Sequence, residues 1–168
     1  LASIETAIRC CDTRDSAPLV LYVSKMVSVP ATSLPRKPDQ RSFNPREEVF
    51  LGFGRVFAGN IKENQDVYVL QADYNPGEED AHMSSSIAKV QIRDLYLMMG
   101  RGLETLHQVP AGNVLALSGL ETSILKSATL SSTHLCRPIA PLMFQATPIV
   151  QVAVEPAHPE DMDALEKG

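Results

Sequence analysis

The stretch Glu48–Gly59, with the sequence EVFLGFGRVFAG, decides the fold of this chain. Successive side chains of a β-strand point to opposite faces, so both faces of this stretch carry apolar residues and Arg55 interrupts one of them. Glycine inside a strand marks a bend, a bulge or a close approach of backbones, as at the corner of a curved barrel. We therefore expect a strand that curves strongly within a β-barrel. One face carries Val49, Leu51, Phe53, Arg55 and Phe57. The other face carries Phe50, Gly52, Gly54, Val56 and Ala58.

The sequence on either side of this stretch predicts further short strands separated by turns. A polar turn at Lys62–Gln65 leads into the apolar segment Asp66–Leu70, which predicts a hairpin over Glu48–Leu70. Pro110-Ala111-Gly112 has the residues of a type I turn, with Pro at its second and Gly at its fourth position. About seven short strands separated by such turns indicate a β-barrel or a β-sandwich. The other expected strands are Leu19–Met26, Val90–Met98 with a bulge near Asp94, Leu103–Val109, Asn113–Ser118 and Ala128–Ser131.

The segment Ser28–Glu47 does not fit the strand pattern. It contains four prolines and scattered charges, with few apolar residues. Proline lacks the backbone N–H that a strand ladder requires. We therefore expect a long, proline-rich loop inserted between the first two strands.

Both ends of the chain differ from its centre. We expect residues 1–17 to link the barrel to an upstream domain, and residues 18–146 to form the barrel. Pro148–Val154 is rich in β-branched residues, and a helix start with Pro159 and acidic residues follows His158. Residues 147–168 therefore predict the first strand and helix of a following α/β domain. The start without Met and the end within a helical pattern indicate a fragment of a longer protein.

Composition narrows the functional classes. The chain has 168 residues, 44% of them hydrophobic, and a net charge of −5, which fits a folded domain and not a general nucleic-acid coat. The charge is uneven, because residues 19–60 hold six basic against three acidic residues. The apolar run Leu19–Val23 is far shorter than the roughly 20 residues of a membrane helix, and no run in the sequence is longer, so we expect no membrane contact.

Catalytic, nucleotide-binding and metal-binding patterns are all weak. Gly54–Gly59 has the first spacing of a phosphate-binding loop, but Asn60 and Ile61 stand where that loop needs Lys and Ser or Thr. The four histidines are widely separated, and the three cysteines lack metal-ligand spacing and favour reduced thiols. We expect no catalytic, nucleotide-binding or metal site in this chain.

Basic side chains give the only site signal. Arg55, Lys62 and Arg101 each lie in a strand or turn from which they could contact a nucleic-acid phosphate. The alternative is that they are solvated charges on a barrel surface. With 5% aromatic residues and no Trp, the composition gives little support to a platform that stacks bases.

Leu19–Met26 and Gly54–Gly59 are two of several sequence blocks that together resemble the second domain of the elongation factor 2 family of translational GTPases. Leu19–Met26 is similar to that domain's opening strand, and Gly54–Gly59 to its arginine-containing strand. The blocks cover most of residues 8–168 in the family's order. The others are Asp94–Arg101, Val109–Val114, Gly119-Leu120 with Thr129-Leu130, and Pro148–Pro156, which resembles the start of the family's third domain.

Within that family, the proline-rich insert and the blocks Lys126–Leu130 and Phe144–Pro148 resemble the elongation factor 2-like ribosome assembly GTPases. The resemblance implies a parent protein that acts in late cytoplasmic maturation of the large ribosomal subunit. There, with the Shwachman–Bodian–Diamond syndrome protein, it promotes release of the anti-association initiation factor. The family's insertion at this position is implicated in partner binding. The insert's basic residues are candidates for that contact, namely Arg36, Lys37, Arg41 and Arg46.

The resemblance thus implies a mainly β protein, a closed Greek-key β-barrel without catalytic activity. The barrel would contact the adjacent GTPase domain of the same chain on one side and ribosomal RNA or a protein partner on the other. GTP and Mg²⁺ would bind only in the parent's upstream domain. Two alternatives stay open: the second domain of the translocase elongation factor 2, and a stand-alone barrel enzyme or metal-binding barrel.

Overall fold

The computed structural model of the chain describes residues 2–35, 47–77, 85–99, 102–140, 152–154, 156, 158 and 162. The described part is mainly β, with one α-helix and one 3₁₀ turn. In chain order the elements are α1 (Ala2–Arg9), β1 (Val20–Pro30), η1 (Ala31–Ser33), β2 (Glu48–Ala58), β3 (Asn60–Lys62), β4 (Asp66–Leu70), β5 (Ile87–Gln91), β6 (Leu95–Met99), β7 (Gly102–Leu106), β8 (Gln108–Pro110), β9 (Val114–Leu117) and β10 (Ala128–Ser131).

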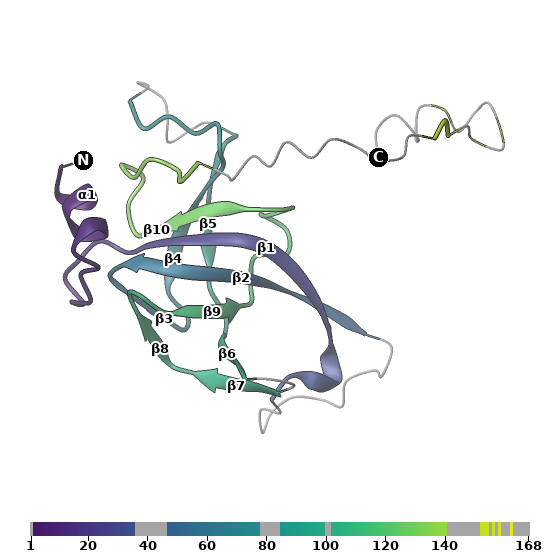
Figure 1. Ribbon diagram of the computed structural model, residues 1–168, viewed down its shortest axis with the longest axis horizontal. Coiled ribbons are helices and arrows are strands. Elements are labelled where there is room, and N and C mark those ends of the chain that lie inside the picture. The colour runs from purple at the N-terminus through teal and green to yellow at the C-terminus, as the bar shows by residue number, and fades with distance from the viewer. Residues whose placement is uncertain are drawn as a thin grey trace.

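Eight of the strands form one antiparallel sheet, in the order β5-β4-β10-β1-β2-β9-β6-β7 (Figure 1). Strands β3 and β8 pair separately. The first strand lies between the second and the last, so the chain crosses over instead of meandering. The expectation of a mainly β, barrel-type fold is confirmed.

A short connection forces the large sheet to curl. Strand β5 is the edge strand on one side of the sheet, and β6 is the second strand from the opposite edge. Only residues 92–94 connect these two strands. The four Cα–Cα steps from Gln91 to Leu95 reach at most about 13–14 Å, so the two edges must come close together. Arg93 N donates to Ser118 O at 3.1 Å and Ser118 N donates to Asp94 O at 3.0 Å, which ties this connection to the end of β9.

The barrel interior is filled by aliphatic side chains from every wall. Leu21 and Val23 of β1 meet Val56 of β2 there, and Ile61 of β3 and Val109 of β8 belong to the same buried cluster. Each of these side chains is at most 3% exposed. Their burial supplies the main stabilisation of the barrel.

The glycine at position 54 allows β1 and β2 to pack closely. A Cβ atom built on Gly54 would lie 2.7 Å from the Tyr22 carbonyl oxygen and 3.0 Å from Leu21 Cδ2. The ladder between these two strands shifts register in two places, between Val20 and Leu21 and between Val23 and Lys25. The expected close backbone approach in a curved strand is therefore confirmed.

The expected hairpin over Glu48–Leu70 is wrong. Strand β2 pairs with β1 and β9, and β4 pairs with β10 and β5. Gly59, with a φ of 77°, redirects the chain after β2, so that β3 leaves the large sheet and pairs with β8. Side chains at such a φ are strained, so glycine suits this position.

Two expected long strands are each divided in the structure. The segment 90–98 is not one bulged strand, because β5 ends at Gln91 and β6 starts at Leu95 with different partners. The segment 103–109 breaks at His107 into β7 and β8. In the turn that follows, Gly112 has a φ of 91°. The residues inside this turn are Ala111 and Gly112, so Gly112 holds the third position that a type II turn gives to glycine, and Pro110 holds the first position instead of the expected second.

The first strand continues into the segment expected to be a loop. Strand β1 runs to Pro30, which pairs with Glu48, and η1 follows. Residues 36–46 lie outside the described residues. Within the expected strand Pro148–Val154, residues 152–154 form no strand and are exposed. Most of the expected third-domain segment lies outside the described residues.

Candidate functional site

Arg55 is exposed on the outer face of the barrel. It lies near the end of β2, opposite Tyr22 of β1 and Val114 of β9. Its Nη2 atom lies 3.5 Å from the Gly112 carbonyl oxygen, at the outer limit of a hydrogen bond. The exposure of Arg55 leaves its guanidinium accessible to a phosphate.

Lys62 is held differently, because it already has an anionic partner. Its Nζ atom donates to Asp15 Oδ2 at 2.8 Å, and Asn60 Nδ2 donates to the other oxygen of the same carboxylate at 2.9 Å. Hydrogen bonds from Lys62 and Asn60, and the charge of Lys62, lower the pKa of Asp15. An RNA phosphate would have to compete with Asp15 for Lys62.

Of the predicted cations, the structure describes Arg55 and Lys62, which lie on different strands. Arg55 belongs to the large sheet and Lys62 to the small β3–β8 sheet. Arg101 lies outside the described residues, and so do the four basic residues of the insert, Arg36, Lys37, Arg41 and Arg46.

The amino-terminal segment, expected to be a linker, forms helix α1 and packs on the barrel. Ile4 and Ala7 of this helix are buried against Val20, Leu70 and Tyr74 of the barrel wall, together with the buried thiol of Cys136. The apolar residues of α1 that pack on the barrel fall at positions 4, 7 and 8, the spacing that puts side chains on one helical face. This pattern was the sequence signal that could have revealed the helix.

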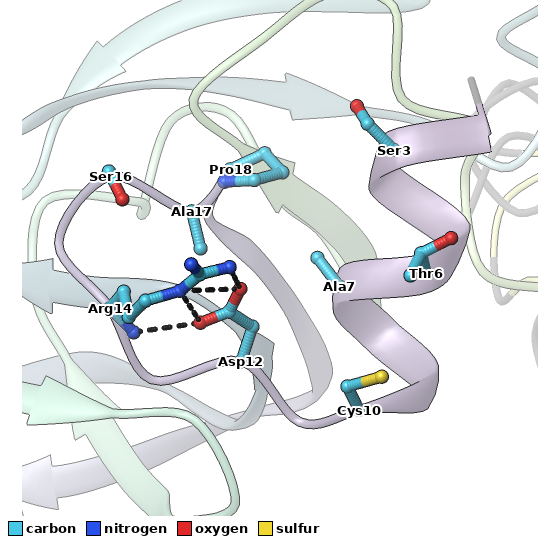
Figure 2. A pocket seen from close by; sticks show the side chains of 9 residues that line it. All are labelled: Ser3, Thr6, Ala7, Cys10, Asp12, Arg14, Ser16, Ala17 and Pro18. Carbon is cyan, nitrogen blue, oxygen red and sulfur yellow. Dashed lines mark hydrogen bonds and ion pairs between the residues drawn. The ribbon is translucent and has the colours of Figure 1, made fainter.

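A cavity of about 610 Å³ lies between α1 and the turn at residues 10–18 that follows it (Figure 2). Asp12 and Arg14 both line this cavity, and the Arg14 guanidinium donates several hydrogen bonds to the Asp12 carboxylate. These bonds lower the pKa of Asp12 to about 2 and raise that of Arg14. The pair fixes the turn, because Arg14 N also donates to Asp12 Oδ1 at 3.1 Å. The remaining lining residues are Ser3, Thr6, Ala7, Cys10, Ser16, Ala17 and Pro18.

Backbone contacts also join this turn to the barrel. Gly59 N donates to the Asp12 carbonyl oxygen at 2.7 Å. A Cβ atom on Gly112 would lie 3.3 Å from Cys11 Sγ, so the turn also contacts the β8–β9 connection. The amino-terminal segment and the barrel are thus attached at several separate points.

A metal site and a phosphate-binding loop are both absent from the part of the chain that the structure describes. That part holds no group of three His, Cys, Asp or Glu side chains placed to bind a metal ion. Residues Gly54–Ala58 lie in an antiparallel strand, whereas a phosphate-binding loop opens a helix. None of the described helices has the length and apolar character needed to span a membrane.

Comparisons with known proteins agree with this geometry. Residues 50–131 match the family model of elongation factor Tu domain 2. The chain is 44% identical to elongation factor-like GTPase 1 of Mus musculus and 40% identical to ribosome assembly protein 1 of Schizosaccharomyces pombe, each over 73% of this chain and 12% of the relative. It is 33% identical to elongation factor 2 of Encephalitozoon cuniculi, over 98% of this chain and 18% of the relative.

The fold and the matched segment define an antiparallel β-barrel domain of the translation-factor second-domain type. The chain belongs, as such a second domain, to the translational GTPases. It spans less than a fifth of the length of the curated relatives named above.

Proposed function

We propose that this chain is the second domain of a ribosome-associated GTPase that acts in late maturation of the large ribosomal subunit. The observation that most strongly supports this proposal is the sequence identity of 40–44% to relatives named elongation factor-like GTPase 1 and ribosome assembly protein 1. The identity to a relative named elongation factor 2 is 33%. The translocase's second domain is therefore the second candidate.

In this proposal the barrel has a mechanical role. The amino-terminal segment is tied to the barrel by the apolar contacts of α1, by the bond from Gly59 to Asp12 and by the Asp15 contacts. A movement upstream of α1 would therefore turn the whole barrel instead of being absorbed by a loose linker. Rigid-body rotation of domains is a common way in which one site alters another.

The remaining parts of the proposal concern the whole parent protein. GTP and Mg²⁺ bind upstream of this domain, and GTP hydrolysis occurs there. The parent works in the cytoplasm with the Shwachman–Bodian–Diamond syndrome protein, and the barrel contacts ribosomal RNA on its exposed outer face. Release of the anti-association initiation factor is the proposed outcome.

Complementation tests the choice between assembly and elongation. Full-length parent is expressed in cells depleted of their ribosome assembly GTPase, and separately in cells depleted of elongation factor 2. The proposal predicts that growth and subunit joining recover only in the first cells. Recovery only in the second cells would identify the parent as the translocase.

A further inference from the structure

Two cations and two aromatic residues alternate on the outer face of strands β1 and β2. Tyr22 pairs directly with Arg55, and Lys25 pairs directly with Phe53. Directly paired residues of an antiparallel ladder lie on the same face with Cβ atoms about 4.5–5.5 Å apart. The inner face is identified by Val23 and Val56, which belong to the interior cluster, so these four residues point outward. We call Tyr22, Lys25, Phe53 and Arg55 the outer patch.

A register shift of β1 creates this alternation. Between Val23 and Lys25 the ladder gains one unpaired residue, Ser24, whose hydroxyl donates to the Phe53 carbonyl oxygen at 3.1 Å. Without the extra residue, Ser24 and not Lys25 would stand opposite Phe53. The bulge thus brings a second cation to the face that already carries Arg55.

The outer patch is exposed and positively charged. Lys25 and Arg55 are exposed, Tyr22 and Phe53 are half-buried, and the adjoining Val114 is 47% exposed. Among the described residues, neither Lys25 nor Arg55 has an ion-pair partner within 4.0 Å. The two rows across the sheet, Thr129-Tyr22-Arg55-Val114 and Lys25-Phe53-Ala116-Tyr96, contain no acidic residue. The patch is positive although the chain as a whole is acidic.

We propose that the outer patch binds an unpaired RNA strand, with bases stacking on Phe53 and Tyr22 and phosphates contacting Lys25 and Arg55. Cations that track the backbone beside aromatic rings that stack bases are the recurrent device for single-stranded nucleic acid. Base faces are unavailable in a paired duplex, so the aromatic residues favour an unpaired strand. This proposal rests on the proposed ribosomal role and adds the chemistry of the contact.

Fluorescence anisotropy of the 168-residue chain with a labelled, unstructured 12-nucleotide RNA tests the proposal. The same RNA annealed to its complement serves as the duplex probe. The variants are Lys25→Gln and Arg55→Gln for charge, and Phe53→Leu and Tyr22→Leu for stacking. Lys89→Gln is the matched control, because Lys89 is an exposed cation paired with Asp66 at 2.9 Å on β4 and β5. Urea unfolding of each variant separates loss of binding from loss of fold.

We expect tighter binding of the single strand than of the duplex. Each charge variant should lower the slope of log affinity against log salt by about 0.7. Each aromatic variant should weaken single-strand binding about fivefold or more while leaving that slope unchanged. Equal binding of strand and duplex, an equal effect of Lys89→Gln, or no RNA binding at 50 mM salt (about a 14 Å screening length) would overturn the proposal.

The full-length parent separates failure of the patch from failure of the proposed function. If patch variants leave its binding to large ribosomal subunits unchanged, the patch proposal is wrong and the ribosomal role stands. If the parent does not bind these subunits while the 168-residue chain still prefers the single strand, the ribosomal role is wrong and the patch remains an RNA site.

Discussion

Replacing Gly54 with alanine should destabilise the barrel, because the new methyl group would meet the backbone of the neighbouring strand. The Cβ atom would lie 2.7 Å from the Tyr22 carbonyl oxygen and 3.0 Å from Leu21 Cδ2. The first of these contacts is with backbone, which is itself held in the ladder between β1 and β2. Side-chain rotation cannot relieve it, so the two strands must separate locally.

Two opposing effects determine how much Gly54→Ala should lower the free energy of unfolding. Overpacking of this kind costs about 1–3 kcal/mol, and the upper part of that range applies because the obstructing atom belongs to the backbone. Alanine in a strand regains about 0.5–1 kcal/mol relative to glycine. A net loss of about 2 kcal/mol should lower the urea midpoint by about 1 M, with a denaturant slope of about 2 kcal/mol/M.

Equilibrium urea unfolding, followed by circular dichroism, measures this loss. Gly77→Ala is the control, since the nearest atom to its Cβ would be Asn75 Oδ1 at 3.5 Å. We expect the control to change stability by no more than about 0.5 kcal/mol. A Gly54→Ala midpoint equal to that of the wild type would refute the close approach of β1 and β2.

Three further predictions concern the amino-terminal segment and the buried thiol. The pKa of Asp12 is lowered from 3.8 to about 2 in the folded chain, so its contribution to stability is present above about pH 4 and is lost as the pH falls toward 2. Unfolding midpoints should therefore fall more steeply from pH 5 to pH 2 in the wild type than in Asp12→Asn, and parallel pH profiles would contradict the Arg14 contact. Ile4→Ala should lower the free energy of unfolding by about 2 kcal/mol, because Ile4 is 8% exposed against the barrel wall; a loss below about 0.5 kcal/mol would mean that α1 is detached in solution. Burial raises the pKa of the Cys136 thiol, whereas the other two cysteines are exposed, so a thiol reagent at pH 8 should label two thiols quickly and the third only on unfolding. Fast labelling of all three would contradict the packing of Cys136 beneath α1.

Local patterns in the sequence were sufficient to locate several strands. Asp66–Leu70 and Ala128–Ser131 match β4 and β10 residue for residue. Both are short apolar segments bounded by polar or turn residues, so the local pattern determines their limits. The mainly β class followed from the same kind of pattern.

The pairing of the strands could not be predicted from local patterns. The direction of the chain after β2 depends on the positive φ of Gly59, and a glycine allows that angle without requiring it. The division of segment 90–98 depends on hydrogen bonds between residues 93–94 and Ser118, which are distant in sequence. Such long-range contacts are set by the whole sheet.

At the candidate site, too, some features could be predicted from the sequence and others could not. The exposure of Arg55 was consistent with its position on an otherwise apolar strand face. The partner of Lys62 was not predictable, because Asp15 lies 47 residues earlier in the chain. The composition argued against a base-stacking platform, yet the register of β1 and β2 places Tyr22 and Phe53 beside two cations. A low total number of aromatic residues therefore does not exclude a local cluster.

We propose that this barrel belongs to a GTPase that releases the anti-association initiation factor from the large ribosomal subunit, and release of that factor can be measured directly. Purified large subunits carrying that factor are incubated with the full-length parent and the Shwachman–Bodian–Diamond syndrome protein, with GTP or with a non-hydrolysable analogue. Sedimentation then measures the factor that remains bound. The account predicts binding of the parent to loaded subunits and release of the factor that depends on GTP. Equal binding to loaded and empty subunits without release, together with activity in a translocation assay, would contradict it.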